Sequence, residues 1–196
     1  MSRTSTTRLG AFALSFLLVG FLVVTGSRAA FTDTTSNDGN SWAAGTVSLT
    51  DDAASVMFNA ADLKPGDTLE NCIVVTYGGS LDADVTLYSE SLTGDLGTYL
   101  DLEIQIGTGG SFDDTATADG QNAASCTGFT ADSTIYPAGT VAGFAGASDD
   151  FASGVGTWGP STGESMTYRF EVTVQDNDLA QGDIASLNFV WEAQNQ

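Results

Sequence analysis

The fold class is decided by the stretch Met166–Gln175, MTYRFEVTVQ, near the end of the 196-residue chain. Large apolar side chains occupy every second position, so that Tyr168, Phe170, Val172 and Val174 share one face. Successive side chains of a β-strand point to opposite faces of the sheet, and this pattern is therefore typical of a strand that covers a core on one side. The segment predicts a half-buried sheet.

Similar patterns recur along the chain. Further strands are predicted at 47–49, 56–58, 72–77, 83–89, 100–107 and 187–193. The run CIVVTY is apolar on both faces, as expected of a central strand. Residues 176–183 join the last two strands, so we expect these two to pair or to be neighbours. With a turn at Lys64-Pro65-Gly66-Asp67, the chain is predicted to be all-β, a jelly-roll-like β-sandwich of about seven to eight strands.

Two stretches rich in Gly, Ser, Asp and Ala, residues 107–125 and 146–165, are predicted to be surface loops. Between them, residues 138–145 predict one or two helical turns, with the apolar members Val141, Phe144 and Ala145 facing inward. Of the two tryptophans near the C-terminus, Trp191 lies on the inward face of its strand and is predicted to be core. Trp158 follows glycines and precedes a proline, and both a core position and a ligand contact stay open for it.

The N-terminus has the organisation of a secretory signal. A basic start is followed by 17 uncharged residues, 9–25, and then by small residues at Ser27 and Ala29. We therefore expect a hydrophobic signal helix within residues 1–29 and cleavage by a signal peptidase after Ala29, with cleavage after Ala30 as the second choice. The protein would then be secreted, to the extracellular space or the cell surface. The alternative is a retained membrane anchor, although 17 residues are fewer than the ~20 that span a bilayer comfortably.

Charge and composition exclude several functions. All 25 acidic residues follow the signal, and only Lys64 and Arg169 remain basic, so the mature chain carries 2 − 25 = −23. Such a chain repels nucleic acid and anionic lipid, and we expect neither a nucleic-acid partner nor membrane contact beyond the uncleaved signal. The chain contains no histidine, which removes the usual general base and the commonest zinc ligand. We expect no enzyme.

Two cysteines and several acidic loops are candidate sites. In an exported chain the pair Cys72 and Cys126 predicts a disulfide, with two buried free thiols as the alternative. Asp176, Asp178 and Asp183 crowd one connection and are weak candidates for calcium ligands, because clustered carboxylates suit this ion. A solvated acidic surface is the competing interpretation, and no other cofactor is expected.

A family resemblance extends from the signal to the C-terminus. The chain resembles the TasA/camelysin family of exported proteins in the order and spacing of its motifs, which are Ala30-Phe31-Thr32-Asp33, Trp42–Thr46 followed by Val47–Leu49, Leu63–Asp67, Gln181-Gly182 and Leu187–Gln194. The resemblance implies a jelly-roll protein, released by a dedicated signal peptidase, that assembles with its own copies into filaments of a biofilm matrix. Some members are called metallopeptidases, an activity for which this sequence offers no ligand set.

The resemblance also gives a role to the polar segment after the signal. Residues 30–44, here called the arm, would complete the sheet of the next copy, with Phe31 and Trp42 as anchors in apolar pockets, and residues 45–196 would form the sandwich. Two other fates stay open for the arm, folding back onto its own sandwich or remaining a disordered tail. The second function that stays open is a monomeric module that binds calcium or a surface glycan, and the third is an extracellular peptidase.

Overall fold

The computed structural model describes residues 43–113 and 126–196, and Ala44–Gln196 forms one compact unit. The predicted signal helix lies outside the described residues. Among the described residues, no helix is both long and apolar enough to cross a membrane. In chain order the described elements are β1 (Leu49–Asp51), β2 (Thr68–Tyr77), β3 (Ala83–Thr93), η1 (Leu96–Thr98), β4 (Leu100–Thr108), β5 (Thr130–Thr140), α2 (Val141–Ala147), β6 (Val155–Trp158), β7 (Ser165–Val174), η3 (Asp178–Ala180) and β8 (Ser186–Asn195).

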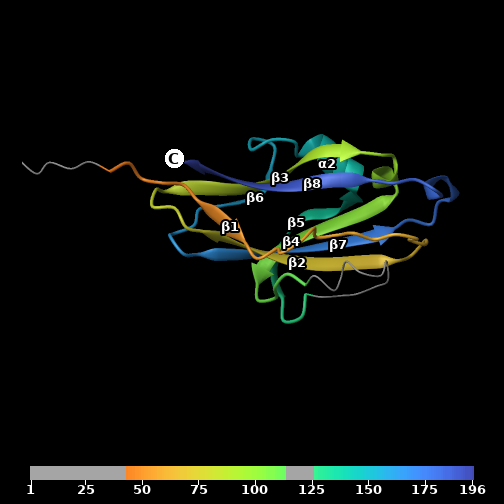
Figure 1. Cartoon of the computed structure of the whole chain (residues 1–196), viewed down its shortest axis with the longest axis horizontal. Helices are drawn as coiled ribbons and strands as arrows, with labels where there is room; N and C mark the ends of the chain where they lie inside the picture. Colours follow the sequence, from red (N-terminus) through yellow and green to blue (C-terminus); the bar gives the residue numbers. More distant parts are fainter. Residues whose placement is uncertain (1–42, 114–125) are drawn as a thin grey trace, which may run out of the picture. The chain divides into compact units, whose positions relative to one another are not determined.

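Eight strands of the described chain form two antiparallel sheets that pack face to face (Figure 1). A five-stranded sheet has the order β1-β2-β7-β4-β5, and a three-stranded sheet has the order β6-β3-β8. The chain crosses between the sheets from β2 to β3, β3 to β4, β5 to β6, β6 to β7 and β7 to β8, which gives the sandwich its jelly-roll-like character. The predicted all-β sandwich is confirmed.

Aromatic side chains of β7 and β8 form the centre of the core. Tyr168 and Phe170 project from β7 and are fully buried, and they meet side chains of β8 across the gap between the sheets. The Phe170 ring lies 4.6 Å from that of Phe189, and the Tyr168 ring lies 5.4 Å from that of Trp191, measured between centroids. The alternation that predicted both strands therefore identified the correct inward faces, including that of Trp191.

The expected pairing of these two strands was wrong. β7 lies between β2 and β4, whereas β8 pairs with β3 in the opposite sheet. Residues 175–185 carry the chain across the sandwich, so the two strands face each other through their side chains. Hydrophobic alternation identifies the buried face of a strand but says nothing about which strand lies beside it.

Three further predictions need correction. Residues 146–165 were expected to be a loop but contain β6, and β5 was not predicted at all. β5 is an edge strand exposed along most of its length, so it lacks apolar alternation, and β6 has only four residues, one of them Gly156 at φ +65. Residues 56–58 do not form a strand, although Met57 and Phe58 pack against the core. The first strand is Leu49–Asp51 instead of 47–49.

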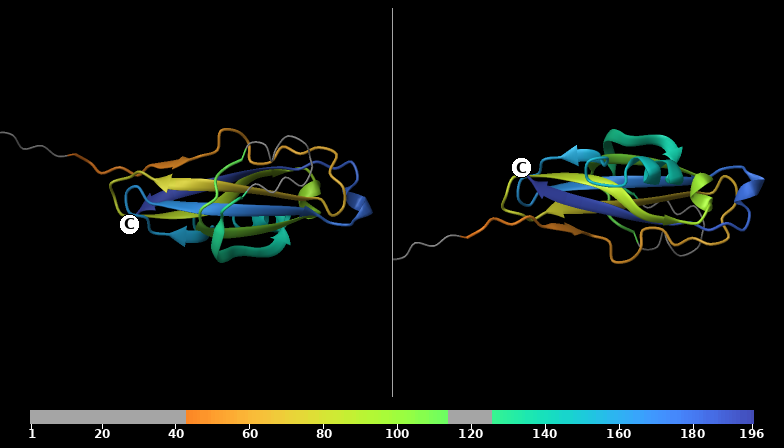
Figure 2. Two further views of the ribbon diagram at one scale, coloured as in Figure 1. Left: turned by 90° about the horizontal axis from the view of Figure 1, so that it is seen from below. Right: turned by 90° about the horizontal axis from the view of Figure 1, so that it is seen from above.

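The short helix α2 fills one side of the sandwich. The Thr140 Oγ1 atom caps it by accepting a hydrogen bond of 2.9 Å from the Gly143 amide. As predicted, Val141 and Phe144 face inward and are buried. The Phe144 ring packs 5.0 Å from Tyr136 and 5.9 Å from Phe189. In both views of Figure 2 the teal segment with β5 and α2 lies on the side opposite the orange segment with β1.

The two ends of the sandwich carry different segments. At one, here called the hairpin end, the β2–β3 connection meets Thr46, whose carbonyl accepts bonds from the Ser80 and Leu81 amides, and the C-terminus, where the Gln196 amide donates to the Asp82 carbonyl. At the other, here called the loop end, lie the turn at residues 64–67, η1 and the β7–β8 connection, which are joined by bonds such as that from the Leu96 amide to the Ile184 carbonyl.

Candidate assembly groove

The last strand, β8, is a long edge strand of the three-stranded sheet. It has ten residues, and among the described residues its ladder pairs it with β3 alone, so one side of its backbone faces away from the sheet. Its sequence, SLNFVWEAQN, contains no proline, glycine or lysine and only one charged residue, Glu192. Proteins usually protect such an edge with proline, lysine or a bulge, because its free N–H and C=O groups can pair with another chain.

A groove of about 310 Å³, lined by apolar side chains and by the polar residues Thr50 and Asp51, lies beside this edge, between β8 and β1. It exists because β1 has only three residues and pairs with β2 over no more than Val75–Tyr77. The inward-facing side chains of β8 are therefore half-buried and accessible from this side. The lining residues are Leu49, Thr50, Asp51, Val75, Phe189, Val190 and Trp191, and we call this feature the β1–β8 groove.

Beneath the groove, three polar atoms are buried with no hydrogen-bond partner in the described structure. They are the Tyr168 hydroxyl and the indole nitrogens of Trp158 and Trp191. Burial raises the pKa of Tyr168 well above its ordinary value, and the two indoles, which approach the hydroxyl without good hydrogen-bond geometry, lower it only in part. Trp158 packs against Tyr77, Ala83 and Val85. The Trp158 side chain is half-buried against the core, as one of its two interpretations expected, and the ligand contact stays a prediction.

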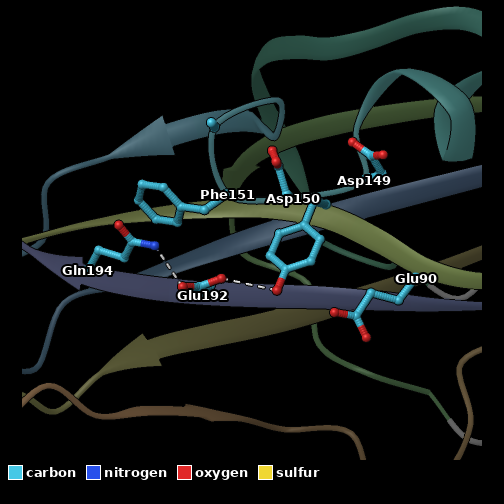
Figure 3. Close-up of a pocket in the computed structure, with 8 residues that line it drawn as sticks. Glu90, Asp149, Asp150, Phe151, Glu192 and Gln194 are labelled. Carbon is cyan, nitrogen blue, oxygen red and sulfur yellow. Dashed lines mark hydrogen bonds between the residues drawn. The ribbon is translucent and has the colours of Figure 1, made fainter.

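A second hollow, of about 390 Å³, is acidic and lies on the outer face of the three-stranded sheet (Figure 3). The side chains of Tyr88 and Phe151 line it together with four carboxylates and two further residues, namely Glu90, Asp149, Asp150, Glu192, Ala152 and Gln194. Burial and a 3.0 Å bond to Glu192 raise the pKa of Tyr88. Hydrogen bonds from Ser153 lower the pKa of Asp150. The hollow is therefore acidic, although its carboxylates do not form a metal-binding group of three within the described residues.

The outer face of the five-stranded sheet carries the disulfide. Cys72 of β2 is joined to Cys126, as predicted, and closes a separation of 54 residues. Beside it, Arg169 of β7 forms ion pairs with Glu70 and Glu171. Burial disfavours the charged guanidinium, but the two carboxylates outweigh this effect and raise the pKa of Arg169. The arrangement attaches residue 126 to the sheet, because Glu70 also accepts from the Cys126 amide.

The predicted calcium ligands lie at the loop end. Asp176 and Asp183 flank η3, and Asp178 is its first residue. Asn177 caps this turn by accepting a hydrogen bond from the Leu179 amide. Within the part of the chain that the structure describes, no three acidic, cysteine or histidine side chains come together as a group that could hold a metal ion. Calcium binding stays a prediction.

The structure does not describe the predicted cleavage residues Ala29 and Ala30 or the predicted anchors Phe31 and Trp42. It does add the groove, which sequence reasoning missed. Two signals could have indicated it, namely the absence of edge-protecting residues from 186–195 and the brevity of the apolar run before the polar residues Thr50, Asp51 and Asp52. Neither signal says that the two strands lie on the same side of the sandwich.

The fold and groove define a β-sandwich with one open side, and comparison with known families agrees with the resemblance noted above. Residues 6–99 match the family described as "Camelysin metallo-endopeptidase". This match supports the resemblance of the chain to the TasA/camelysin family. A search of curated proteins found no significant match.

Proposed function

We propose that the chain is a secreted structural protein whose copies assemble into extracellular or cell-surface filaments. The arm of one copy would pair with β8 of the next and fill its β1–β8 groove. The observation that supports this most strongly is the ten-residue edge of β8, which has an apolar groove beside it and no second partner strand among the described residues. Addition of a strand to a free sheet edge is a common way in which proteins bind extended segments.

The arm has the length that this role needs. Cleavage after Ala29 would leave 15 residues, 30–44, ahead of the sandwich, and as a strand they would reach roughly 50 Å at ~3.3 Å per residue. Phe31 and Trp42 are 11 positions apart, so one regular strand would point them to opposite faces. We therefore assign Phe31 to the groove and Trp42 to the junction between copies.

Charge opposes this assembly. Mature copies at −23 repel one another at low ionic strength. We therefore expect filaments to form only when salt or divalent cations screen the repulsion. Filaments that form readily in low salt with a chelator present would contradict this part of the proposal.

The test compares residues 30–196 with residues 45–196, by electron microscopy and sedimentation, in high salt with and without calcium. The proposal expects filaments from the longer chain and monomers from the shorter one, since only the first has the arm. A synthetic peptide of residues 30–44 should bind the shorter chain and cap it without giving filaments. A peptide with the same composition in scrambled order is the control. Monomers from both chains in all conditions would overturn the proposal.

A second candidate function rests on the acidic hollow around Tyr88 and Phe151, whose carboxylates could hold calcium or whose aromatic walls could contact a surface glycan. In this case the protein would act as a monomeric exported module. Thermal unfolding of residues 45–196 with calcium, with magnesium and with glycans tests it. A calcium-specific or glycan-specific rise in melting temperature that is lost in Glu192→Gln would favour this function.

We propose no peptidase activity for this chain, despite the description of its family. The lack of histidine throughout the sequence deprives a hydrolytic zinc site of its commonest ligand. Cleavage of a peptide by the purified mature chain, abolished by a chelator, would show that this proposal is wrong.

A further inference from the structure

Most of the large apolar side chains that remain exposed are gathered at the two ends of the sandwich. The described residues contain five exposed large hydrophobic side chains, and four of these lie at the loop end or at the hairpin end. The fifth, Val56, precedes Met57, whose carbonyl accepts a hydrogen bond of 3.0 Å from Asn71 of β2. Single exposed apolar residues need no explanation, but a cluster of them on a polar surface marks a site of contact with another molecule.

The loop end carries Leu179 and Ile184, here called the loop-end pair. Both belong to the β7–β8 connection, and they are 70% and 77% exposed. The Leu179 amide donates a hydrogen bond of 2.9 Å to the Asn177 side chain. The Ile184 carbonyl accepts one of 3.1 Å from the Leu96 amide. Figure 1 shows this connection in blue at the end of the sandwich that lies away from the C-terminus. The fold therefore holds two bulky apolar side chains in solvent at the tip of the molecule.

The hairpin end carries Val47 and Leu81, here called the hairpin-end pair, which are 37% and 38% exposed. The Leu81 amide donates to the Thr46 carbonyl at 3.2 Å, so the two segments lie side by side. A Cβ atom added to Gly45 would lie 2.2 Å from Leu81 Cδ2, which means that the Leu81 side chain rests directly on the Gly45 backbone. Because Gly45 follows the arm, this pair lies at the base of the arm.

We propose that the loop-end pair of one copy packs against the hairpin-end pair of the next copy and so forms an end-to-end contact. This inference rests on the function proposed above and adds a second contact, at the tips of the sandwich and away from the β1–β8 groove. Each arm leaves its own sandwich at the hairpin end, so its donation brings that end against the next copy. The two pairs are different surfaces of one chain. A contact between different surfaces repeats into an open filament, whereas a contact between like surfaces closes a dimer.

The size and the surroundings of the two pairs determine when the contact forms. Four side chains bury far less than the about 1,000 Å² expected of a stable interface, so the contact acts only between copies that the arm already holds together. Asp178 and Asp183 each precede a member of the loop-end pair, and Asp82 follows the hairpin-end pair. These carboxylates repel one another across the contact until salt screens them, whereas screening does not weaken the burial of apolar surface.

Sedimentation of the mature chain tests the contact through the critical concentration, which is the concentration of chain left in solution beside filaments. Three variants are compared with the parent in high salt, namely Leu179→Ser/Ile184→Ser, Val47→Ser/Leu81→Ser and, as a control with a side chain that is 64% exposed, Val56→Ser. We expect each double variant to raise the critical concentration about tenfold and the control to leave it within about twofold of the parent. Thermal melting of the same variants without the arm checks that they fold.

A variant with all four changes shows whether the two pairs contact each other. If they do, loss of either pair removes the whole contact, and the critical concentration of this variant stays within about twofold of that of a double variant. Rises that multiply, an unchanged value in either double variant, or an equal rise in Val56→Ser would overturn the inference. Filaments still form in each of these cases, so the proposed function stands. A parent chain that forms no filaments would overturn the proposed function and the end-to-end contact with it.

Discussion

On one side of the sandwich the chain itself crosses between the sheets through β5, α2 and β6, and on the opposite side the short strand β1 lies beside β8. The first side is filled by Phe144, which is fully buried, and its edges carry Pro137 and the positive-φ Gly156. The second side has a ten-residue edge without such residues and an apolar groove. Proline and irregular backbone prevent edge pairing, so one side carries edge protection, whereas β8 has neither this protection nor a second partner strand among the described residues.

The largest expected effect comes from placing a charge on each edge in turn. Val190→Asp adds a carboxylate to the middle of the β8 edge, beside the β1–β8 groove, where it would repel the acidic arm, and Ser133→Asp adds the same charge to the exposed edge strand β5. We expect Val190→Asp to abolish filaments and Ser133→Asp to leave them, as measured by sedimentation at equal salt. Both variants should melt near the parent temperature. Equal loss of assembly in both would remove the distinction between the two sides.

For stability, truncation of an apolar side chain should have a larger effect on the closed side, with β5, α2 and β6, than on the open side, with β1 and β8. Phe144→Ala removes a fully buried ring from the closed side, and we expect a loss of about 3–5 kcal/mol in the free energy of unfolding. Leu49→Ala removes a half-buried side chain from the open side, for which about 1–2 kcal/mol is expected. Urea unfolding of residues 45–196 measures both. A larger loss for Leu49→Ala would mean that the open side is part of the stable core.

Two buried tyrosines allow a finer comparison. The Tyr77 hydroxyl donates to the Leu81 carbonyl at 2.6 Å, whereas the Tyr168 hydroxyl, beneath the groove, has no partner by hydrogen-bond geometry in the described structure. Tyr77→Phe should therefore lower the free energy of unfolding by about 1–2 kcal/mol. Tyr168→Phe should change it by less than about 0.5 kcal/mol. Chemical unfolding gives both values. A substantial loss for Tyr168→Phe would show that its hydroxyl is bonded in solution, for example to an internal water.

The smallest expected effect is a pH-dependent change on the closed side, in the connection between α2 and β6. Ser153 donates hydrogen bonds to Asp150 in the connection between α2 and β6, and these lower the pKa of Asp150 below its ordinary 3.8. A carboxylate whose pKa is lower in the folded state than in the unfolded state stabilises the fold. This stabilisation is complete when the pH is above the unfolded-state pKa, and it is lost as the pH falls through the folded-state pKa. We expect the Ser153 amide signal in NMR spectra to shift below about pH 4 in the parent and not in Asp150→Asn. An unchanged titration in that variant would assign the shift to another group.

The sequence predicted those parts of the fold in which buried and exposed side chains follow a regular pattern along the chain. β7 and β8 alternate between core and surface, so both strands and their inward residues were correct, as was the inward orientation of Phe144. β5 and β6 could not be found in this way, since an edge strand exposed along most of its length has no alternation and a four-residue strand is too short for it. Pairing was equally hidden, because the sheet neighbours of β7 come from residues about 70 and 100 positions earlier.

The candidate site divides in the same way. The cysteine pair was predicted because two thiols in an exported chain have few other fates. The groove was not predicted, because it depends on Leu49 and Phe189 lying on one side of the sandwich, and their strands belong to different sheets. Only the three-dimensional arrangement brings a short first strand and a long last strand together.

The central claim, that the open side receives another copy, is tested most directly by amide hydrogen exchange along β8. The mature chain, residues 30–196, is compared as monomer in low salt and as assembled material in high salt, with residues 45–196 in both salts as the control. Pairing with an arm predicts that those β8 amides that exchange freely in the monomer become protected on assembly, while the amides at the outer edge of β5 do not change. Filaments in which β8 exchanges as fast as in the monomer would contradict the account.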